Sequence, residues 1–177
     1  EETTSGLRPL RSFDLRIPVM ASNDARSKTL FDNAYGTGQS CWTTILDLID
    51  PRGVGAPVAG MSVVVIGYGD VGRGCARFGS ALGAAVTVVE LDPVRALQAS
   101  MDGFAVASLE DAAPSAGMLI SATGECSTIP LSALEAAPEG AIVTVAGGVD
   151  GEVSIDEAVA ASWVMAESGD PHVQTLT

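Results

Sequence analysis

Positive charge is scarce in this sequence. Nine lysines and arginines stand against 22 aspartates and glutamates in 177 residues, which gives a formal net charge of −13. Nucleic-acid backbones and anionic membrane surfaces are bound through basic patches, so this balance excludes both as expected partners. No apolar run reaches the roughly 20 residues that span a membrane, and the polar start over residues 1–5 does not resemble a signal peptide. We therefore expect a cytoplasmic protein whose partner is a small molecule.

Cysteine and histidine are also rare. The three cysteines and the single histidine, His172, are widely separated and form no Cys-x-x-Cys or mixed Cys/His cluster. This spacing excludes a disulfide framework and a structural zinc site, so we expect no metal and reduced thiols in or near the core. Lysine is the rarest cation, because Lys28 alone accompanies eight arginines. A lysine ammonium is compact and can exchange its proton, which makes Lys28 a candidate for chemistry, with chance as the alternative.

Apolar, β-branched runs alternate with small-residue helical segments from about residue 61 onward. Repeated units of this kind predict an α/β fold with a parallel, doubly wound sheet of Rossmann type, and strands this apolar are typical of burial on both faces. Strands are expected from near residue 61 and over 85–90, 104–107, 118–122, 141–146 and, as a last core strand, 163–166; helices are expected over 72–82, 93–101, 110–116, 131–137 and 155–161.

A helical lead-in segment precedes this alternation. Residues 24–35 and 38–49 have helical patterns, and a turn-rich connector follows them. We expect a lead-in over residues 1–60 whose helices pack on the core, and a Rossmann domain over residues 61–177, the two forming one domain. Because the chain starts without methionine on what resembles a functional motif, we expect it to come from a longer polypeptide.

The first expected strand runs directly into a glycine-rich segment. Gly67-Tyr68-Gly69-Asp70-Val71-Gly72-Arg73-Gly74 follows it, and Glu90 closes the next strand, at roughly the 20-residue spacing of a dinucleotide-binding fingerprint. Gly67 permits the tight turn, Gly69 admits a pyrophosphate, and Gly72 lets the helix pack on the strand. The Glu90 carboxylate is suited to ribose hydroxyls and repels a 2′-phosphate, so the segment predicts NAD rather than NADP. The alternative is a glycine-rich turn in a plain α/β protein.

Small residues also follow the fourth and fifth of the expected strands. They are Thr123-Gly124 and Ala146-Gly147-Gly148. Ligands of doubly wound sheets lie beyond the carboxyl ends of the strands, so we expect these loops to face the cofactor. Loop glycines that only turn the chain are the alternative.

Four segments in chain order closely resemble the S-adenosylhomocysteine hydrolase family: residues 1–6, 23–36, 67–76 and 90–93. The resemblance covers nearly the whole chain and corresponds to that family's NAD-binding domain with its lead-in. It implies that tightly bound NAD oxidises the ribose 3′-hydroxyl of the substrate, homocysteine is eliminated, water adds, and the ketone is reduced again. It also implies that the parent protein is a homo-oligomer.

The resemblance assigns roles to residues of the lead-in. It implies that Glu2, Lys28 and Asp32 contact ribose hydroxyls, with Lys28 helping the 3′ proton to leave. Asn33 is implied to hold the nicotinamide carboxamide. Independently, Lys28 and Asp32 are four residues apart on an expected helix and therefore share a face, where either can exchange a proton with a nearby hydroxyl. An exposed salt bridge is the alternative for this pair.

The resemblance also places the hydroxyls of residues 3–5 against the nicotinamide half of the cofactor, with a helix N-cap or a solvated terminus as the alternative. The expected cofactor contacts comprise Thr3, Thr4, Ser5, Asn33, Gly67, Gly69, Asp70, Val71, Gly72, Arg73, Gly74, Glu90, Thr123, Ala146 and Gly147.

The chain departs from the family pattern at several positions. Gly148 stands where the family has a histidine of its proton-handling group, and Arg95 replaces an asparagine that reaches the cofactor. Thr37 replaces a cysteine, and Leu30 replaces a second lysine. The sequence therefore predicts NAD binding more strongly than complete hydrolase activity. An oxidoreductase or epimerase acting on another nucleoside-like alcohol, and a non-catalytic NAD-binding regulatory module, stay open as alternatives. His172 is assigned no catalytic role.

Overall fold

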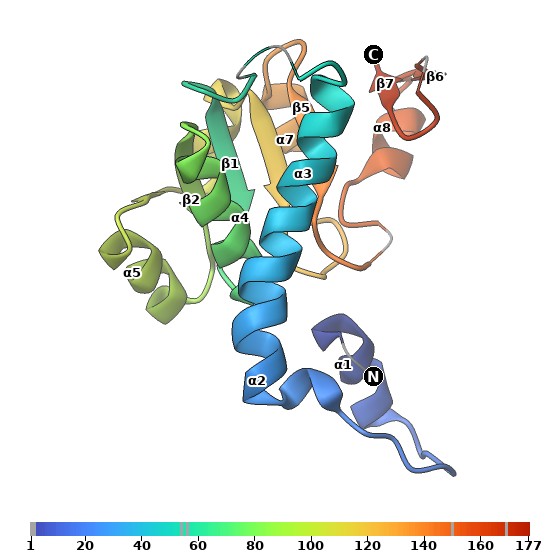
Figure 1. The fold of residues 1–177 in the computed structure, drawn as a ribbon. Coiled ribbons are helices and arrows are strands. Elements are labelled where there is room, and N and C mark those ends of the chain that lie inside the picture. Colours follow the sequence, from blue (N-terminus) through green and yellow to red (C-terminus); the bar gives the residue numbers. More distant parts are fainter. Residues whose placement is uncertain (1–2, 54, 56, 150, 169) are drawn as a thin grey trace.

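A parallel sheet forms the centre of the protein in a computed structural model that describes residues 3–53, 55, 57–149, 151–168 and 170–177 (Figure 1). Its five strands lie in the order β3-β2-β1-β4-β5. The strands are β1 (Ser62–Ile66), β2 (Ala85–Val89), β3 (Ala105–Val106), β4 (Met118–Ser121) and β5 (Ile142–Val145). Because the chain proceeds outward from β1 in both directions, strand order reverses between β1 and β4, where such sheets bind ligands. This arrangement confirms the predicted Rossmann-type fold.

Helices cover both faces of the sheet and bury two separate apolar clusters. On one face α3 (Gly38–Ile49), α4 (Asp70–Ala81) and α5 (Pro93–Met101) contribute to the cluster that holds Trp42 and Cys75. On the other face lie α6 (Leu109–Ala112), η3 (Ala113–Ser115), α7 (Leu131–Ala136) and α8 (Ile155–Ala160).

Strand β1 shows why an unbroken apolar run forms the middle of this sheet. Successive side chains of a strand point to opposite faces. Val63 and Val65 belong to the cluster under α3 and α4, whereas Val64 and Ile66 belong to the opposite cluster. All four are buried, and burying each such side chain stabilises the fold by roughly 1.5–3 kcal/mol.

The lead-in is helical, as expected, but its boundaries differ from the sequence pattern. It consists of α1 (Thr4–Ser12), η1 (Ser22–Asp24), α2 (Arg26–Lys28) and a π-helix, η2 (Thr29–Thr37), that continues into α3. The expected interruption between residues 35 and 38 is therefore wrong, because Thr37 and Gly38 both keep helical backbone angles. Helix α1 corresponds only to the N-cap alternative for residues 3–5, and it contains Pro9, which normally disfavours a helix interior.

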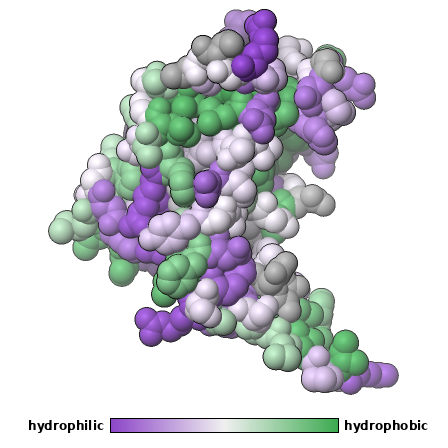
Figure 2. Space-filling view, in the orientation of Figure 1, coloured by the Kyte–Doolittle hydropathy of each residue, from purple (hydrophilic) through white to green (hydrophobic). Residues whose placement is uncertain are grey.

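An arm over residues 13–21 leaves α1 and extends away from the sheet (Figure 1). It is exposed and apolar, with Ile17 and Met20 at 71% and 83% exposure. Figure 2 shows hydrophobic atoms along this part of the molecule. No helix among the described residues is both long and apolar enough to cross a membrane.

The last expected core strand is wrong. Instead of joining the sheet over residues 163–166, the chain forms β6 (Met165–Glu167), which pairs antiparallel with β7 (Gln174–Leu176) in a separate hairpin. A neighbour close in sequence satisfies the backbone of this short strand. Strand β5 is consequently an edge strand, and Val143 and Val145 remain 36% and 40% exposed.

The expectation that the thiols lie in or near the core is wrong for Cys126, which is exposed in a turn, whereas Cys75 is buried.

Helices α3 and α4 cross at a pair of glycines. A Cβ on Gly38 would lie 2.6 Å from the carbonyl carbon of Gly74. We expect Gly38→Ala to lower the free energy of unfolding by about 1–3 kcal/mol, because the helices must separate to admit the methyl group. Urea denaturation measures this, with Gly36→Ala as the matched control, since Gly36 is exposed and its nearest contact is 3.4 Å away. Equal stability of the two variants would contradict this packing.

Candidate functional site

The glycine-rich loop between β1 and α4 forms the first part of the site. Gly67 has φ +93°, and its amide donates to the Val89 carbonyl at 2.8 Å, which ties the loop to β2. A Cβ on Gly67 would lie 3.0 Å from Thr123 Cγ2, and a Cβ on Gly72 would overlap the Gly67 carbonyl oxygen. Glycine is therefore required at both positions by the backbone fold and by close approach. The loop opens at the carboxyl ends of β1 and β4.

The N-terminus of α4 follows this loop directly. Gly69 precedes the helix and supplies no side-chain cap, and the twelve-residue helix presents its first amides toward the mouth of the loop. Asp70 is paired with Arg73 at 2.6 Å, so its carboxylate does not stand alone beside an incoming phosphate. Arg95 adds positive charge, because its Nη1 lies 3.8 Å from where a Cβ of Gly69 would be. This cradle fits a pyrophosphate.

Glu90 lies at the carboxyl end of β2 and is oriented by backbone amides. Its Oε2 accepts from the Tyr68 amide at 2.7 Å, and its Oε1 accepts from the amides of Leu91 and Asp92 at 2.8 and 2.9 Å. The carboxylate is thus fixed beside the glycine-rich loop. Oε1 already accepts two amides, whereas Oε2 accepts one and retains a second lone pair for a ribose hydroxyl. The residues present therefore fit the adenosine half of NAD.

Tyr68, between two glycines of the fingerprint, anchors the glycine-rich loop to the apolar core. Its ring is buried against Phe104 with centroids 6.0 Å apart, and its hydroxyl donates to Asp102 Oδ2 at 2.8 Å. Burial, followed by the Asp102 hydrogen bond, raises the pKa of Tyr68 above its ordinary value. Sequence reasoning missed this role, since position two of the fingerprint is variable and carries no signal for it.

We expect Tyr68→Phe to lower the free energy of unfolding by about 0.5–1.5 kcal/mol, because only the hydrogen bond to Asp102 is lost. The backbone amide that holds Glu90 remains, so NAD affinity should not change. The neutral hydroxyl stabilises the fold below the ordinary tyrosine pKa of about 10, and this contribution is lost as the pH rises above it. Denaturation curves should therefore converge for the two proteins at alkaline pH. A gap that widens there would contradict this assignment.

The lead-in contributes a hydrogen-bonded polar cluster. Lys28 Nζ donates to Asn33 Oδ1 at 2.7 Å and lies 3.1 Å from Asp32 Oδ2. Asn23, which is 3% exposed, joins it, with Oδ1 3.5 Å from both Lys28 Nζ and Asn33 Nδ2. Its own Nδ2 donates to Thr4 Oγ1 at 3.1 Å. Four residues of the expected site are thus brought together with Asn23, which lies in a family-like segment but had no expected role.

The π-helix explains how Lys28 reaches both following residues. In an α-helix, position i+4 lies next to position i on the helix surface. The wider turn of a π-helix brings position i+5 next to position i as well. Lys28 directly precedes η2, so Asp32 and Asn33 both face its ammonium. Single-turn π segments are frequent at functional sites. The exposed-salt-bridge alternative is therefore incomplete, because the ammonium is also held by a buried amide.

The hydroxyls of residues 3–5 have different surroundings. Thr3 caps α1, with its Oγ1 accepting from the Gly6 amide at 3.0 Å, as the N-cap alternative expected. Ser5 lies across the loops that follow β4 and β5, because its Cβ is 3.4 Å from the Cβ position of Gly124 and its Oγ is 3.5 Å from that of Gly148. Helix α1 therefore connects the lead-in cluster to the sheet.

The loops after β4 and β5 form the far side of the site. Thr123 Oγ1 accepts from the Glu125 amide at 3.1 Å and lies 2.7 Å from Thr128 Oγ1. Ala146 donates its amide to Ser121 at 2.7 Å, which fixes the start of the second loop. In Figure 1 the strand arrows point toward the end of the molecule where α1 and α2 lie. The carboxyl ends of the strands and the lead-in cluster thus share one side.

Three residues of the expected site are not placed at the mouth of the loop. Glu2 lies outside the described residues. Gly74 faces the lead-in, since a Cβ there would meet the Ala34 carbonyl and lie 3.2 Å from Gly38 Cα. Val71 packs against the cluster under α3 and α4. Their cofactor contacts stay predictions.

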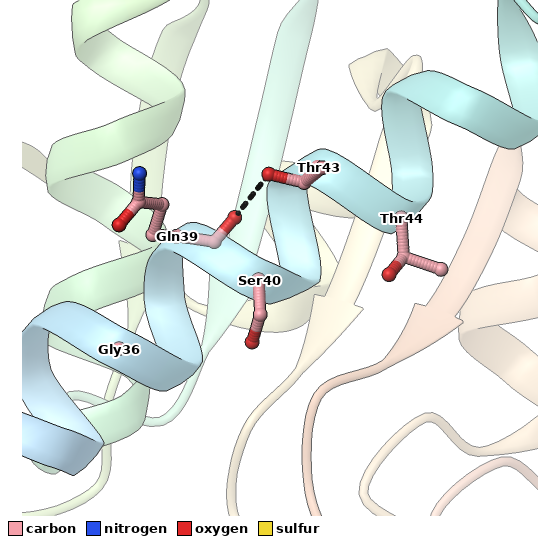
Figure 3. A pocket seen from close by; sticks show the side chains of 5 residues that line it. All are labelled: Gly36, Gln39, Ser40, Thr43 and Thr44. Atoms are coloured by element: carbon pink, nitrogen blue, oxygen red, sulfur yellow. Dashed lines mark hydrogen bonds between the residues drawn. The ribbon is translucent and has the colours of Figure 1, made fainter.

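A separate shallow depression of about 300 Å³ lies on the outer side of η2 and α3, lined by Gly36, Gln39, Ser40, Thr43 and Thr44 (Figure 3). Thr43 Oγ1 donates to the Gln39 carbonyl at 3.1 Å within the helix. None of the expected site residues lines it. Elsewhere in the described chain, no group of three or more His, Cys, Asp or Glu side chains is placed to hold a metal ion.

The sheet, the glycine-rich loop and the fixed carboxylate define a Rossmann-type dinucleotide-binding domain with the features that select NAD. The model of the S-adenosyl-L-homocysteine hydrolase NAD-binding domain matches residues 33–176. The chain belongs to the S-adenosyl-L-homocysteine hydrolase family and contains its NAD-binding domain. NAD is accordingly its cofactor.

Curated relatives agree with this assignment. The chain is 46% identical over 158 residues to an adenosylhomocysteinase of Thermococcus kodakarensis and 43% identical over 158 residues to an S-inosyl-L-homocysteine hydrolase of Methanothermobacter thermautotrophicus. These alignments cover 87% of this chain in both cases, and 36% and 37% of the relatives. The chain therefore spans little more than a third of the length of the relatives it matches.

Solved structures are similar in fold. A dipicolinate synthase chain from Bacillus halodurans superimposes with a TM-score of 0.62 at 20% identity, over 77% of this chain and 46% of that protein. A phosphoglycerate oxidoreductase from Rhizobium etli gives 0.59 at 18% identity, over 81% and 50%. At these identities the likeness shows the fold alone.

Proposed function

We propose that this chain is the NAD-binding part of an enzyme that reversibly hydrolyses S-adenosylhomocysteine to adenosine and homocysteine. The observation that carries the proposal is the Lys28 cluster, in which an ammonium, a carboxylate and two amides meet beside the glycine-rich helix. A plain dinucleotide-binding domain has no need for these groups. They are suited to a ribose, whose hydroxyls both donate and accept hydrogen bonds.

In this proposal NAD supplies the hydride acceptor, and the chain supplies orientation and proton transfer. When bound, NAD would accept the hydride from C3′, and the 3′-hydroxyl proton would pass to the Asp32 carboxylate or to the neutral amine form of Lys28, which lies 3.1 Å from it. Asn33 holds Lys28 through Oδ1; one Nδ2 hydrogen is directed at Asn23, and the second is proposed to donate to the nicotinamide carboxamide. Glu2 is proposed as a further ribose contact. Glu90 and the glycine-rich loop fix the other end of the cofactor.

Gly148 favours a second candidate function. The family's histidine at this position is absent, and the nearest polar group to the missing Cβ is the Ser5 hydroxyl at 3.5 Å. An enzyme with this site retains the groups for ribose oxidation but has fewer for later proton transfers. The second proposal is therefore an NAD-dependent oxidoreductase or epimerase of another nucleoside-like alcohol. A regulatory module that binds NAD without catalysis is the third.

The base of the substrate, the assembly and the compartment also belong to this proposal. Relatives bear the names adenosylhomocysteinase and S-inosyl-L-homocysteine hydrolase, so adenine and hypoxanthine are both bases to test. We propose a homo-oligomer in the cytoplasm, acting as one domain of a larger subunit with its lead-in over residues 1–60. Nucleic acid and membrane surfaces are not proposed as partners, because the net charge of −13 repels both.

The test uses the full-length polypeptide that contains this chain. S-adenosylhomocysteine and S-inosylhomocysteine are added separately, and bound NADH and free thiol are measured together. NADH formation with thiol release supports the hydrolase. NADH without thiol replaces it by the oxidoreductase, and bound NAD that is never reduced replaces both by the regulatory module.

A further inference from the structure

Glu152 is a buried acid outside the four family-like segments and outside the cofactor contacts expected from the sequence. It is 1% exposed, which places it among the most deeply buried side chains of the protein. A buried carboxylate without a cation is costly, so such a group is either paired or functional. Within the described part of the chain, no lysine, arginine or histidine forms an ion pair with it.

The two carboxylate oxygens of Glu152 have different surroundings. Oε2 accepts from Ser121 Oγ at 2.5 Å and lies 3.3 Å from Thr123 Oγ1. Oε1 is buried and has no hydrogen-bond partner among the described residues. It lies against Gly147, where any Cβ would overlap it. The unpaired oxygen is therefore directed at the loop after β5.

The position of this oxygen relates it to the cofactor. Glu90 marks the adenosine half at the end of β2, and the glycine-rich loop marks the pyrophosphate at the end of β1. The second half of a dinucleotide lies across the switch point, over the strands on the other side. These strands are β4 and β5, whose carboxyl ends carry Ser121 and Gly147, two of the contacts of Glu152.

We propose that Glu152 is a positioning residue whose charge, acting from beneath Gly147, stabilises the cationic nicotinamide of NAD over the neutral nicotinamide of NADH. The missing cation beside Oε1 is then supplied by the oxidised cofactor itself. Glycine is required at position 147 because a Cβ there would overlap Glu152 Oε1. This inference rests on NAD as the cofactor and is independent of which substrate is oxidised.

The experiment compares the dissociation constants of NAD and NADH for the full-length protein and for Glu152→Gln, which keeps the shape and removes the charge. We expect the variant to lose about tenfold of the preference for NAD. A tenfold change corresponds to a rise of about 30 mV in the potential of the bound two-electron couple. Glu157→Gln removes an exposed charge from α8 and should leave the preference unchanged.

Ser121→Ala separates charge from loop packing, because it removes a hydrogen bond and keeps the carboxylate. If Glu152 acts only by ordering the loop, Ser121→Ala and Glu152→Gln should change both dissociation constants alike, and the proposal fails. If Glu152→Gln does not fold, the reduction potential of the NAD/NADH couple bound to the wild-type protein tests the proposal. The proposal requires this potential to lie below that of the free couple. A potential at or above that of free NAD would overturn the inference. Cofactor reduction by adenosine, measured in parallel, shows whether the proposed function stands regardless.

Discussion

Replacing Lys28 with alanine is expected to reduce the rate of NADH formation from a nucleoside substrate by about a hundredfold to ten-thousandfold, the usual range for loss of a proton-transfer group. Lys28 is the only lysine in the sequence, and its ammonium is held by Asn33 and Asp32 at 2.7 and 3.1 Å. NAD affinity should stay within a few fold, because the glycine-rich loop and Glu90 are untouched. Rapid mixing with adenosine, followed by NADH absorbance, measures the rate.

Two further variants show whether the proton matters or only the charge. Lys28→Arg keeps a cation that does not release its proton, so its rate should remain close to that of the alanine variant. Arg26→Ala removes a neighbouring charge from α2 and should leave the rate unchanged. A Lys28→Ala protein that reduces its cofactor at the wild-type rate would contradict the assignment. A fully active Lys28→Arg protein would limit Lys28 to holding the substrate.

Replacing Glu90 with alanine is expected to weaken NAD binding by roughly tenfold to several hundredfold. Hydrogen bonds to a charged group contribute about 1.5–3 kcal/mol each, and this carboxylate is placed to accept from the ribose hydroxyls. The variant also loses the bond from Tyr68, which fixes the glycine-rich loop. NADP should lose much less affinity than NAD, because the negative charge that repels its 2′-phosphate is gone. Calorimetric titration with both cofactors measures this change in selectivity.

Glu110→Ala is the matched control for Glu90→Ala, since Glu110 is an exposed acid on α6. Its NAD and NADP affinities should equal those of the wild type. Glu90→Gln keeps the hydrogen-bonding shape without the charge and should restore part of the NAD affinity. If Glu90→Ala binds NAD as tightly as the wild type does, the cofactor does not use this carboxylate.

The sheet was largely predictable from local pattern. Buried parallel strands are continuous apolar runs, so Val63 to Ile66 indicated β1, and a proline suited to a first turn, Pro93, indicated the start of α5. The strand expected at residues 163–166 failed because a run of three or four apolar residues does not say which strand it pairs with. The strand that forms there, β6, pairs with β7, which is close in sequence, instead of with the edge of the sheet.

The site residues that belong to a sequence motif could be predicted. Those brought together only by the tertiary fold could not. The glycine-rich loop and Glu90 follow a spacing with a physical cause, and the structure brings them together. The contacts of Lys28 with both Asp32 and Asn33 depend on a π-turn, which has no simple sequence signal. Glu152 is separated from Ser121 by a long stretch of chain, and only the tertiary fold places its carboxylate beneath Gly147.

The most direct measurement uses adenosine that carries deuterium at C3′, mixed with the NAD-loaded full-length protein. After denaturation, mass spectrometry of the released cofactor shows whether the deuterium has moved to the nicotinamide ring. Direct oxidation of the ribose beside Lys28 predicts labelled NADH, and Lys28→Ala should abolish the label while retaining bound NAD. Unlabelled cofactor from a protein that binds both NAD and adenosine would contradict the account.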